Sequence, residues 1–352
     1  MGDERVRSAI ANWAPRFVAN GVDLNDFQRV TAGVERWDDW CAAWSACGAM
    51  YERMGEDAAA RGHAVTAGEL FRHAAMAYHF GKFLFVHRPG ELRAAHDHVV
   101  RDYQRALPAG AFPGERVAIP YEDDVPMYGI LRGPPETPRP PVVVLIPGLD
   151  SVKEELHAYG DEFLRRGMAV LAIDGPGQGE MEFDRPMRHD YEVPVRQAID
   201  YLATRTDVDA NRVGVFGVSL GGYYAPRAAA GESRVRAAIS LAGPYAIAPT
   251  FDQVPPLTRA ALVARLHARD EAEARAALEP FDLTDQMRKV RCPLLIIMGR
   301  QDHIIPPAHA EHMAATAGGD AELWMLDDGN HVCNNVPYKH RPQMADWMRQ
   351  HV

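Results

Sequence analysis

Ser219 stands between two glycines in the segment Gly217-Val218-Ser219-Leu220-Gly221, which follows a short apolar run and precedes alanine-rich sequence. A serine between glycines where a strand gives way to a helix is typical of a tight turn that exposes the hydroxyl to a substrate. A serine hydroxyl is a poor nucleophile at neutral pH, so it needs a base and a third group that orients the base. Short matches to this pattern also occur in ordinary turns, so the residues that could act as partners decide between the two interpretations.

An acid and a histidine follow the last two apolar runs of the chain. Asp302 comes after the run "PLLIIM", and His331 comes after "AELWML". Serine, aspartate and histidine in this chain order are typical of a nucleophile elbow with its partners. Asp327 and Asp328 are alternative acids, but they would share the loop of His331, whereas Asp302 approaches from the neighbouring strand. We therefore predict Ser219, Asp302 and His331 as catalytic residues. Four other histidines lie beside the acid or in predicted helices, where a surface position is expected: His303, His309, His312 and His340.

A tetrahedral intermediate also needs hydrogen-bond donors for its oxyanion. One donor is expected to be the backbone N–H after the nucleophile, that of Leu220, and the other is expected from the loop after an early strand. The loop Pro147-Gly148-Leu149-Asp150-Ser151 makes the N–H of Leu149 the second predicted donor. Its alternative is an ordinary glycine turn.

The sequence predicts neither a cofactor nor a metal site. The glycine-rich segment "DGPGQG" (174–179) lacks the spacing of a dinucleotide-binding loop and a Walker lysine, and Pro176 has no N–H for a phosphate. We interpret it as a structural turn. The cysteines are few and widely separated, which favours a reducing compartment over a disulfide framework or a zinc site; they are Cys41, Cys47, Cys292 and Cys333.

Two regions of different pattern must position these residues. Residues 2–107 follow helical periodicity, and Thr66 with Glu69 has the spacing of a helix-capping box. After residue 108, apolar runs of strand length alternate with charged segments of helical period, at 152–166, 192–205, 220–230, 257–289, 308–317 and 340–350. This alternation predicts a doubly wound, mostly parallel α/β sheet, with the loops that follow its strands at one edge. We expect a helical domain at 1–112 and a catalytic domain at 113–352 that carries a lid insertion at 244–289.

Composition and charge disfavour a nucleic-acid-binding, a membrane-bound and a secreted protein. The 352 residues carry a formal net charge of −10, which disfavours binding to nucleic acid or to anionic membranes. The N-terminus is charged where a signal peptide would be apolar, and no run of 18 apolar residues occurs. These observations predict a cytoplasmic protein.

Residues 115–352 resemble the α/β-hydrolase superfamily, and the likeness extends to the N-terminal region. The segments "TAGELFRHAAMAYHF", "PGLDSVKEE", "DGPGQGEMEF", "GVSLGGYYAPR" and "DDGNHVCNN" resemble the group of 2,6-dihydroxypseudooxynicotine hydrolases, polyketide-shortening hydrolases and FrsA-like esterases. The resemblance implies the same triad, a helical cap over the active site and a homodimer. It also implies hydrolysis of a C–C bond beside an aryl or β-keto carbonyl, with a small aromatic or acyl substrate.

One departure from this group lies in the lid. The resemblance implies an additional glutamate there for the nicotine-derived substrate, but "PYAIAPTFDQVPPLTR" contains no glutamate, and Asp252 is its only acid. This difference disfavours the same nicotine-derived substrate and leaves the triad unaffected.

Several further residues are candidates for a substrate pocket, each with a structural alternative. Tyr223 and Tyr224 follow the nucleophile and could instead pack its helix, while Glu154 could belong to a solvated first helical turn. Aromatic and histidine side chains of the helical region could line a cavity or form a helix core: Trp40, Trp44, Tyr78 and His79.

The leading hypothesis is a serine hydrolase that cleaves a C–C bond in an aryl ketone, a β-diketone or a polyketide-like substrate. The alternatives are a carboxylesterase or amidase with the same triad, an acyltransferase, and a binding protein on a hydrolase fold. The residues leave a covalent acyl-enzyme and a direct attack of water both open.

Overall fold

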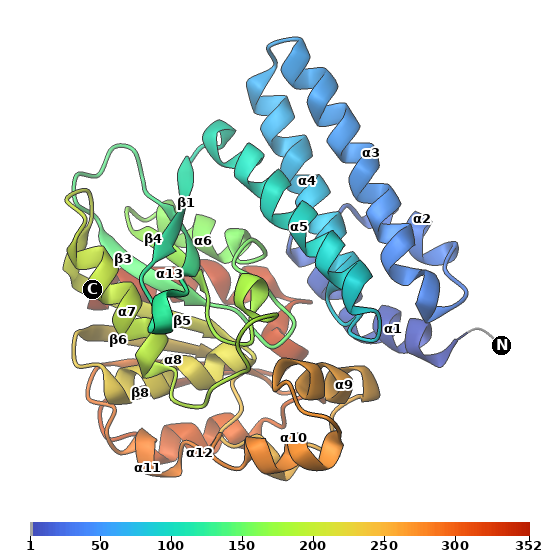
Figure 1. The fold of residues 1–352 in the computed structure, drawn as a ribbon. Coiled ribbons are helices and arrows are strands. Elements are labelled where there is room, and N and C mark those ends of the chain that lie inside the picture. Colours follow the sequence, from blue (N-terminus) through green and yellow to red (C-terminus); the bar gives the residue numbers. More distant parts are fainter. Residues whose placement is uncertain (1–2) are drawn as a thin grey trace. The chain divides into compact units, whose positions relative to one another are not determined.

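The structure is a computed structural model that describes residues 3–352, and it divides into two compact units at Glu115/Arg116 (Figure 1). The first unit consists almost entirely of helices, as the sequence predicts. Its helices are α1 (Glu4–Ala19), α2 (Leu24–Ala32), α3 (Trp40–Ala60), α4 (Ala64–Lys82) and α5 (Pro89–Ala106), with short 3-10 helices at Trp37–Asp39 and Leu107–Ala109.

Aromatic rings fill the core of the helical unit. The Phe17 ring stacks on Phe80 at a centroid distance of 3.9 Å and packs against Trp40 and Trp44 at 6.2 and 5.1 Å. Both tryptophans are fully buried. Large buried rings are a major source of apolar stabilisation in a protein core.

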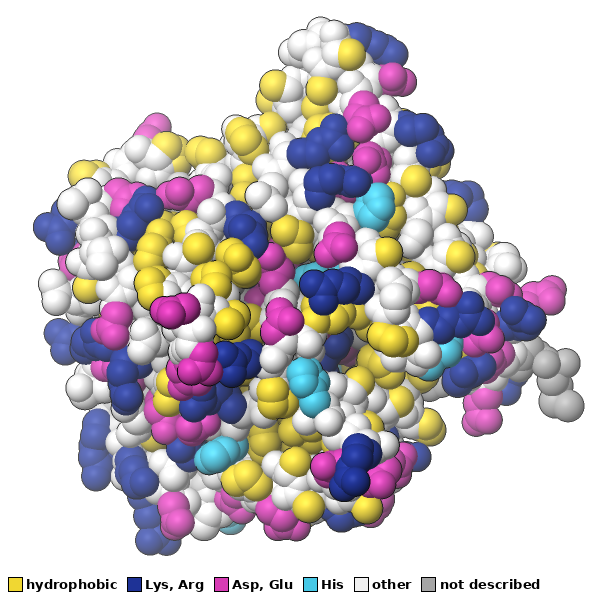
Figure 2. All heavy atoms as spheres, in the orientation of Figure 1, with side chains coloured by type: hydrophobic (Ala, Val, Ile, Leu, Met, Phe, Trp, Pro, Cys, Tyr) yellow, Lys and Arg dark blue, Asp and Glu magenta, His cyan; other side chains and the backbone are white. Residues whose placement is uncertain are grey.

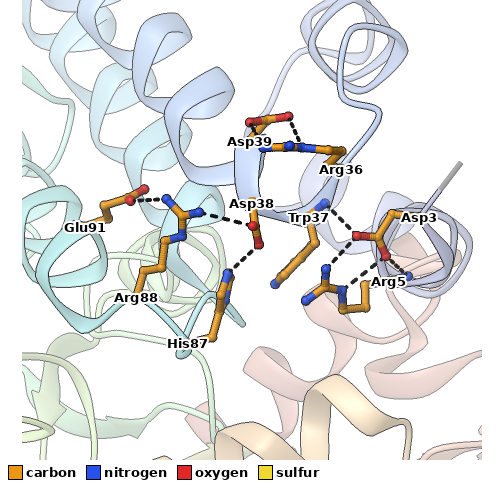
Figure 3. Close-up of polar contacts among 9 residues, drawn as sticks. All are labelled: Asp3, Arg5, Arg36, Trp37, Asp38, Asp39, His87, Arg88 and Glu91. Carbon is orange, nitrogen blue, oxygen red and sulfur yellow. Dashed lines mark hydrogen bonds and ion pairs between the residues drawn. The ribbon is translucent and has the colours of Figure 1, made fainter.

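Two aspartates connect separate segments of the helical unit (Figure 3). Asp3 accepts hydrogen bonds from the backbone N–H groups of Arg5 and Trp37, both at 2.9 Å, so it caps α1 and connects it to the turn before α3. The hydrogen bond from the Arg5 side chain holds the pKa of Asp3 well below its usual range. Asp38 pairs with His87, 3.0 Å away, in the connection between α4 and α5.

The start of α4 differs from the prediction. The helix begins at Ala64 with His63 in the N-cap position, and no side chain caps it there. Thr66 and Glu69 therefore lie inside the helix, and the predicted capping box is wrong.

The second unit contains an eight-stranded mixed sheet. Its strands are β1 (Gly114–Ile119), β2 (Met127–Arg132), β3 (Pro141–Ile146), β4 (Ala169–Asp174), β5 (Asp209–Val218), β6 (Val235–Leu241), β7 (Leu294–Gly299) and β8 (Ala321–Leu326), in the spatial order β1-β2-β4-β3-β5-β6-β7-β8. Strand β2 pairs antiparallel with β4, and the pairings from β4 through β8 are parallel. This confirms the predicted mostly parallel α/β sheet.

Helices flank this sheet (Figure 1). They are α6 (His157–Leu164), α7 (Glu192–Ala203), α8 (Leu220–Gly231), α9 (Pro256–Arg265), α10 (Glu271–Leu278), α11 (Thr284–Met287), α12 (Ala308–Thr316) and α13 (Arg341–His351), with short 3-10 helices at Glu122–Asp124, Gly179–Met181, Ala248–Thr250, His331–Cys333 and Pro337–Lys339. Helices α6 and α13 contact each other, as do α7 and α8.

The segment between β6 and β7 is helical but interrupted. The predicted helical stretch 257–289 forms α9, α10 and α11, and Asp270 caps α10 by accepting the N–H of Glu273 at 2.9 Å. A buried ion pair of 2.9 Å between Arg265 and Glu182 connects this segment to the loop after β4.

The order of the strands places two loops beside each other. Strand β3 pairs with β4 on one side and with β5 on the other. From β3 the chain crosses to β4, and from β5 it crosses in the opposite direction to β6. Ligands of open α/β sheets bind at such a switch point, beyond the carboxyl ends of the strands. The loop 147–151 after β3 and Ser219 after β5 both lie there.

The face of the molecule shown in Figure 2 carries acidic and basic side chains interspersed with each other, without one extended basic area. A membrane-spanning helix needs about 20 mostly apolar residues, and none of the helices in residues 3–352 combines that length with that apolar character.

Candidate active site

Ser219 occupies a sharp turn between β5 and α8. Its backbone has φ 56° and ψ −118°, a conformation that a non-glycine residue rarely adopts. The glycines around it permit the turn: a Cβ on Gly217 would lie 1.8 Å from the carbonyl oxygen of Gly221, and a Cβ on Gly221 would lie 2.3 Å from that of Ile146. Glycine is therefore needed at both positions because the backbone of neighbouring segments leaves no room for a side chain, as in a nucleophile elbow.

The predicted residues from three distant segments meet at this turn. The Oγ of Ser219 lies 3.1 Å from Nε2 of His331, and the Nδ1 of His331 lies 2.7 Å from Oδ2 of Asp302. With its Nδ1–H donated to Asp302, the imidazole presents Nε2 to the serine hydroxyl as an acceptor. This is the geometry in which a histidine can take up a serine proton while a carboxylate holds the ring.

The carboxylate of Asp302 is itself held in place. Its Oδ1 accepts the backbone N–H groups of Ile304 and Ile305, both at 2.9 Å, and its side chain is fully buried. A Cβ on Gly299 would lie 2.3 Å from the carbonyl oxygen of Gly329, so the loops after β7 and β8 touch through their backbones. This close approach brings Asp302 within reach of His331.

The loop that carries His331 is closed by side-chain amides. The N–H of Asn330 donates to Oδ1 of Asn335 at 2.9 Å, and Nδ2 of Asn335 donates to the carbonyl of Asp328 at 2.7 Å. Cys333 is buried beneath the loop, and burial raises the pKa of its thiol to about 12. It therefore stays protonated and has the features of a packing residue.

The alternative acids point elsewhere. Asp327 is 87% exposed and pairs with Arg300 at 2.9 Å, and Asp328 pairs with Lys339 at 2.6 Å. His331 is hydrogen-bonded to Asp302 instead.

The loop after β3 lies against the nucleophile. A Cβ added to Gly148 would be 3.3 Å from Cβ of Ser219 and 3.7 Å from its Oγ. The next residue, Leu149, and the residue after the nucleophile, Leu220, are both buried. Their N–H groups remain the predicted oxyanion donors.

A buried cluster of charges follows this loop. The Lys153 ammonium is 2.7 Å from Asp174, 2.8 Å from Glu154 and 2.8 Å from Glu180, and Glu180 also pairs with Arg116 at 2.5 Å. Burial disfavours the ammonium, but the surrounding carboxylates outweigh this effect and hold the pKa of Lys153 above its usual value. The three carboxylates are close enough together to hold a metal ion; the ammonium contacts all three and supplies the positive charge there.

Glu154 is the least compensated member of this cluster. One of its carboxylate oxygens pairs with Lys153, and Oε2 is buried without a hydrogen-bond partner among residues 3–352. Burial raises the pKa of Glu154 to about 7, because the opposing effect of Lys153 is smaller. A buried acid with a raised pKa stabilises the fold when protonated, so its contribution is lost as the pH rises from about 4.5 to about 7.

We therefore expect Glu154→Gln, which cannot ionise, to gain stability relative to the wild type across this pH range. The difference in the free energy of unfolding between Glu154→Gln and the wild type should be about 2 to 3 kcal/mol more favourable to the variant at pH 8 than at pH 4.5. Urea denaturation at several pH values measures it, and Glu136→Gln, at an exposed glutamate, is the matched control. A constant difference between Glu154→Gln and wild type at every pH would contradict this assignment.

The remaining pocket candidates of the catalytic unit lie in different surroundings. The Tyr223 and Tyr224 rings are fully buried; the Tyr223 hydroxyl donates to the carbonyl of His189 at 3.2 Å, and the Tyr224 ring stacks on Tyr191 at 3.8 Å. Asp252 is 69% exposed and forms an ion pair with Arg275. Their role in substrate binding remains a prediction.

The candidates in the helical unit are interior residues of that unit. Trp40 and Trp44 belong to the aromatic core, and the indole N–H of Trp40 donates to the carbonyl of Phe80 at 2.9 Å. Tyr78 stacks on His98 at 4.3 Å, and His79 is fully buried. A role in substrate binding remains a prediction for these residues too.

A second group of possible metal ligands occurs in the helical unit. Glu52, His98 and Asp102 lie close together, but Arg101 pairs with Glu52 at 2.7 Å and with Asp102 at 3.1 Å. These acids are already compensated by a guanidinium.

Two residues around the site were not singled out from the sequence. Gln178, in the turn after β4, donates to the carbonyls of Pro147 and Gly148, and Tyr191 donates to Gln178. The glycine-rich segment 174–179 was recognised as a turn, but nothing local to it indicates which loop its glutamine contacts.

Comparison with known proteins gives the family. The family described as "Esterase FrsA-like" matches residues 23–351. The 2,6-dihydropseudooxynicotine hydrolase of Paenarthrobacter nicotinovorans is 33% identical over 352 residues, which covers 96% of this chain and 90% of that protein. The crystal structure of the 2,6-dihydroxy-pseudo-oxynicotine hydrolase superposes with a TM-score of 0.88 at 30% identity, covering 97% of this chain and 95% of the other.

A fungal relative shares a shorter region. The alpha/beta hydrolase gkaG of Penicillium citrinum is 29% identical over 240 residues, 63% of this chain and 56% of that protein. The N-terminal helical unit and the hydrolase unit are both covered by the bacterial relative. On these matches the chain belongs to the FrsA-like esterase family and is an enzyme of the α/β-hydrolase class.

Proposed function

We propose that this hydrolase uses Ser219 as a nucleophile to cleave a C–C bond next to a carbonyl group, in an aryl ketone, a β-diketone or a polyketide-like substrate. The observation that supports the proposal most strongly is the hydrogen-bonded chain from Ser219 through His331 to Asp302. The bond type is supported by the similarity to the 2,6-dihydropseudooxynicotine hydrolase over nearly the whole chain.

In the first half of the proposed reaction, the Ser219 oxygen bonds to the carbonyl carbon while His331 Nε2 takes the hydroxyl proton. The carbonyl oxygen becomes an oxyanion, held by the N–H groups of Leu149 and Leu220. Collapse of this intermediate breaks the C–C bond, and the electron pair leaves on a carbon that is stabilised as an enolate or a phenolate. The imidazolium of His331 returns its proton to that carbon.

In the second half, water releases the acyl group. His331 takes a proton from the water as its oxygen attacks the acyl-enzyme carbonyl, and the collapse of the second tetrahedral intermediate breaks the bond to Ser219. The imidazolium then protonates the serine oxygen, and the products are a carboxylic acid and the protonated leaving group. Asp302 stabilises the imidazolium at both stages.

A carboxylesterase is the second candidate, favoured by the family's own description as esterase-like. The same residues would serve, because an alkoxide leaves in place of the enolate and takes the proton of His331 on oxygen. An acyltransferase is a further variant, in which an alcohol replaces water in the second half.

Matched aryl esters and aryl β-diketones that share one acyl group test this proposal. We expect the purified wild type to release the carboxylic acid from the diketone, and Ser219→Ala to release none. Hydrolysis of the ester alone would favour the carboxylesterase, and a new ester formed with added alcohol would favour acyl transfer. Equal turnover by wild type and Ser219→Ala would contradict a serine nucleophile altogether.

The small-molecule substrate, a cytoplasmic location and a homodimer also belong to this proposal. The small number and wide separation of the cysteines in the sequence support a reducing compartment. Light scattering on the purified chain measures the oligomeric state, and a monomer at micromolar concentration would contradict the homodimer.

A further inference from the structure

The glycine-rich turn after β4 contains a buried glutamine that touches the loop after β3. Gln178 is fully buried, and its Nε2 donates to the carbonyl oxygens of Pro147 at 2.6 Å and of Gly148 at 3.2 Å. Two carbonyls can be satisfied together only by a group with two N–H donors, which a side-chain amide has. The contact therefore depends on the residue type and not on its size alone.

The other end of this amide is also fixed. The hydroxyl of Tyr191 donates to Oε1 of Gln178 at 2.5 Å, and the Tyr191 ring is fully buried. Gly175 makes this arrangement possible, because a Cβ there would lie 2.2 Å from the Tyr191 hydroxyl. The NH₂ group of the amide faces two carbonyls, which only accept, and its oxygen faces the hydroxyl that donates to it. Exchanging the two ends would place oxygen against oxygen, so only one orientation of the amide satisfies all these contacts.

The contact with Gly148 has a consequence for the next peptide group. A trans peptide is planar, so the carbonyl of Gly148 and the N–H of Leu149 point in opposite directions. Holding the Gly148 oxygen on Gln178 therefore aims the Leu149 N–H away from Gln178. Gly148 itself lies against Ser219, with a Cβ position 3.7 Å from the serine Oγ.

We propose that Gln178 is a positioning residue that sets the direction of the Leu149 N–H and so completes the oxyanion hole, with Tyr191 fixing the orientation of Gln178. This inference rests on the proposed function, since it requires an oxyanion at Ser219. It assigns the turn 174–179 a role in the rate of the reaction as well as in the fold.

Gln178→Met, which keeps the length of the side chain but cannot donate, tests the proposal. With an aryl ester as substrate, kcat should fall about 10- to 100-fold, up to the loss seen on removing one oxyanion donor, while KM stays within about twofold. The dissociation constant of an aryl trifluoromethyl ketone, which forms a tetrahedral adduct with an oxyanion, should rise by the same factor as kcat falls. Tyr191→Phe should shift both quantities in the same direction by a smaller factor.

Control variants show whether the loss of kcat is specific to Gln178 and Tyr191 or arises from any comparable substitution nearby. Gln197→Met and Tyr201→Phe, both on α7, should leave kcat and the inhibitor constant unchanged, and thermal unfolding should show that each variant is folded. If Gln178→Met does not fold, Tyr191→Phe carries the test, because it leaves the glutamine in place.

An unchanged kcat in the folded variants would overturn the inference, as would a lower kcat without weaker binding of the ketone. Ser219→Ala in the same assay distinguishes a failure of the role of Gln178 from a failure of the proposed function. If Ser219→Ala is inactive but Gln178→Met and Tyr191→Phe match the wild type, only the role of Gln178 fails. If Ser219→Ala turns over the ester as the wild type does, the proposed function fails, and the role of Gln178 fails with it.

Discussion

Ser219→Ala is expected to lower kcat for ester or diketone hydrolysis by about 10⁶-fold, and Asp302→Asn by about 10⁴-fold. The first change removes the nucleophile. The second keeps the shape of the acid but removes the negative charge that orients His331 and stabilises its protonated form. Steady-state kinetics on freshly purified variants measures both effects.

Residues that act as one unit should not have additive effects. The double variant of Ser219 and Asp302 should be no slower than Ser219→Ala, because the aspartate acts only through a histidine that no longer has a serine to activate. Asp327→Asn, which changes an exposed acid paired with Arg300, is the matched control and should retain wild-type kinetics. A large loss in Asp327→Asn with little loss in Asp302→Asn would contradict the assignment of the acid.

Lys153→Met is expected to destabilise the protein by about 3 to 5 kcal/mol, because it leaves buried carboxylates without their central cation. Lys153 is fully buried and contacts Asp174, Glu154 and Glu180. Arg116 remains, but it pairs with Glu180 alone among the three acids. Chemical denaturation at pH 7 measures the loss.

Two comparisons make this result specific. Lys289→Met removes an exposed lysine and should change the stability by less than about 0.5 kcal/mol. Without the Lys153 ammonium, which lowers the pKa of Glu154, that carboxyl should be mostly protonated at pH 7. Adding Glu154→Gln to Lys153→Met should therefore change the stability little, because the charges left without a cation are those of the other acids. A Lys153→Met protein as stable as the wild type would show that the cluster does not need its cation.

The sheet and the positions of Ser219, Asp302 and His331 on it could be predicted because their causes are local in the sequence. Continuous apolar runs of strand length can be buried only in a sheet that is covered on both faces, and the elbow around Ser219 needs glycines wherever backbone meets backbone. The order of acid and histidine along the chain then placed Asp302 and His331 at the ends of neighbouring strands, where the structure has them.

The parts that the sequence did not reveal depend on contacts between distant segments. The sequence predicts one helix over 152–166, but α6 begins at His157, and the N–H of Lys153 before it donates to the distant Asp174 at 2.8 Å. Glu154 had a solvated helical turn as its alternative interpretation, and it is buried beside Lys153. The contact between Gln178 and the loop after β3 is likewise long-range. At α4, the helix extends past the local capping signal of Thr66 and begins at Ala64.

The central claim is that His331 and Asp302 make Ser219 a nucleophile, and covalent labelling tests it most directly. Incubation with a fluorophosphonate, followed by peptide mass spectrometry, should place the phosphonyl group on Ser219 in the wild type, with labelling abolished in Ser219→Ala and slowed strongly in Asp302→Asn. A folded wild-type protein that is not labelled, or one that is labelled equally in Ser219→Ala, would contradict the account.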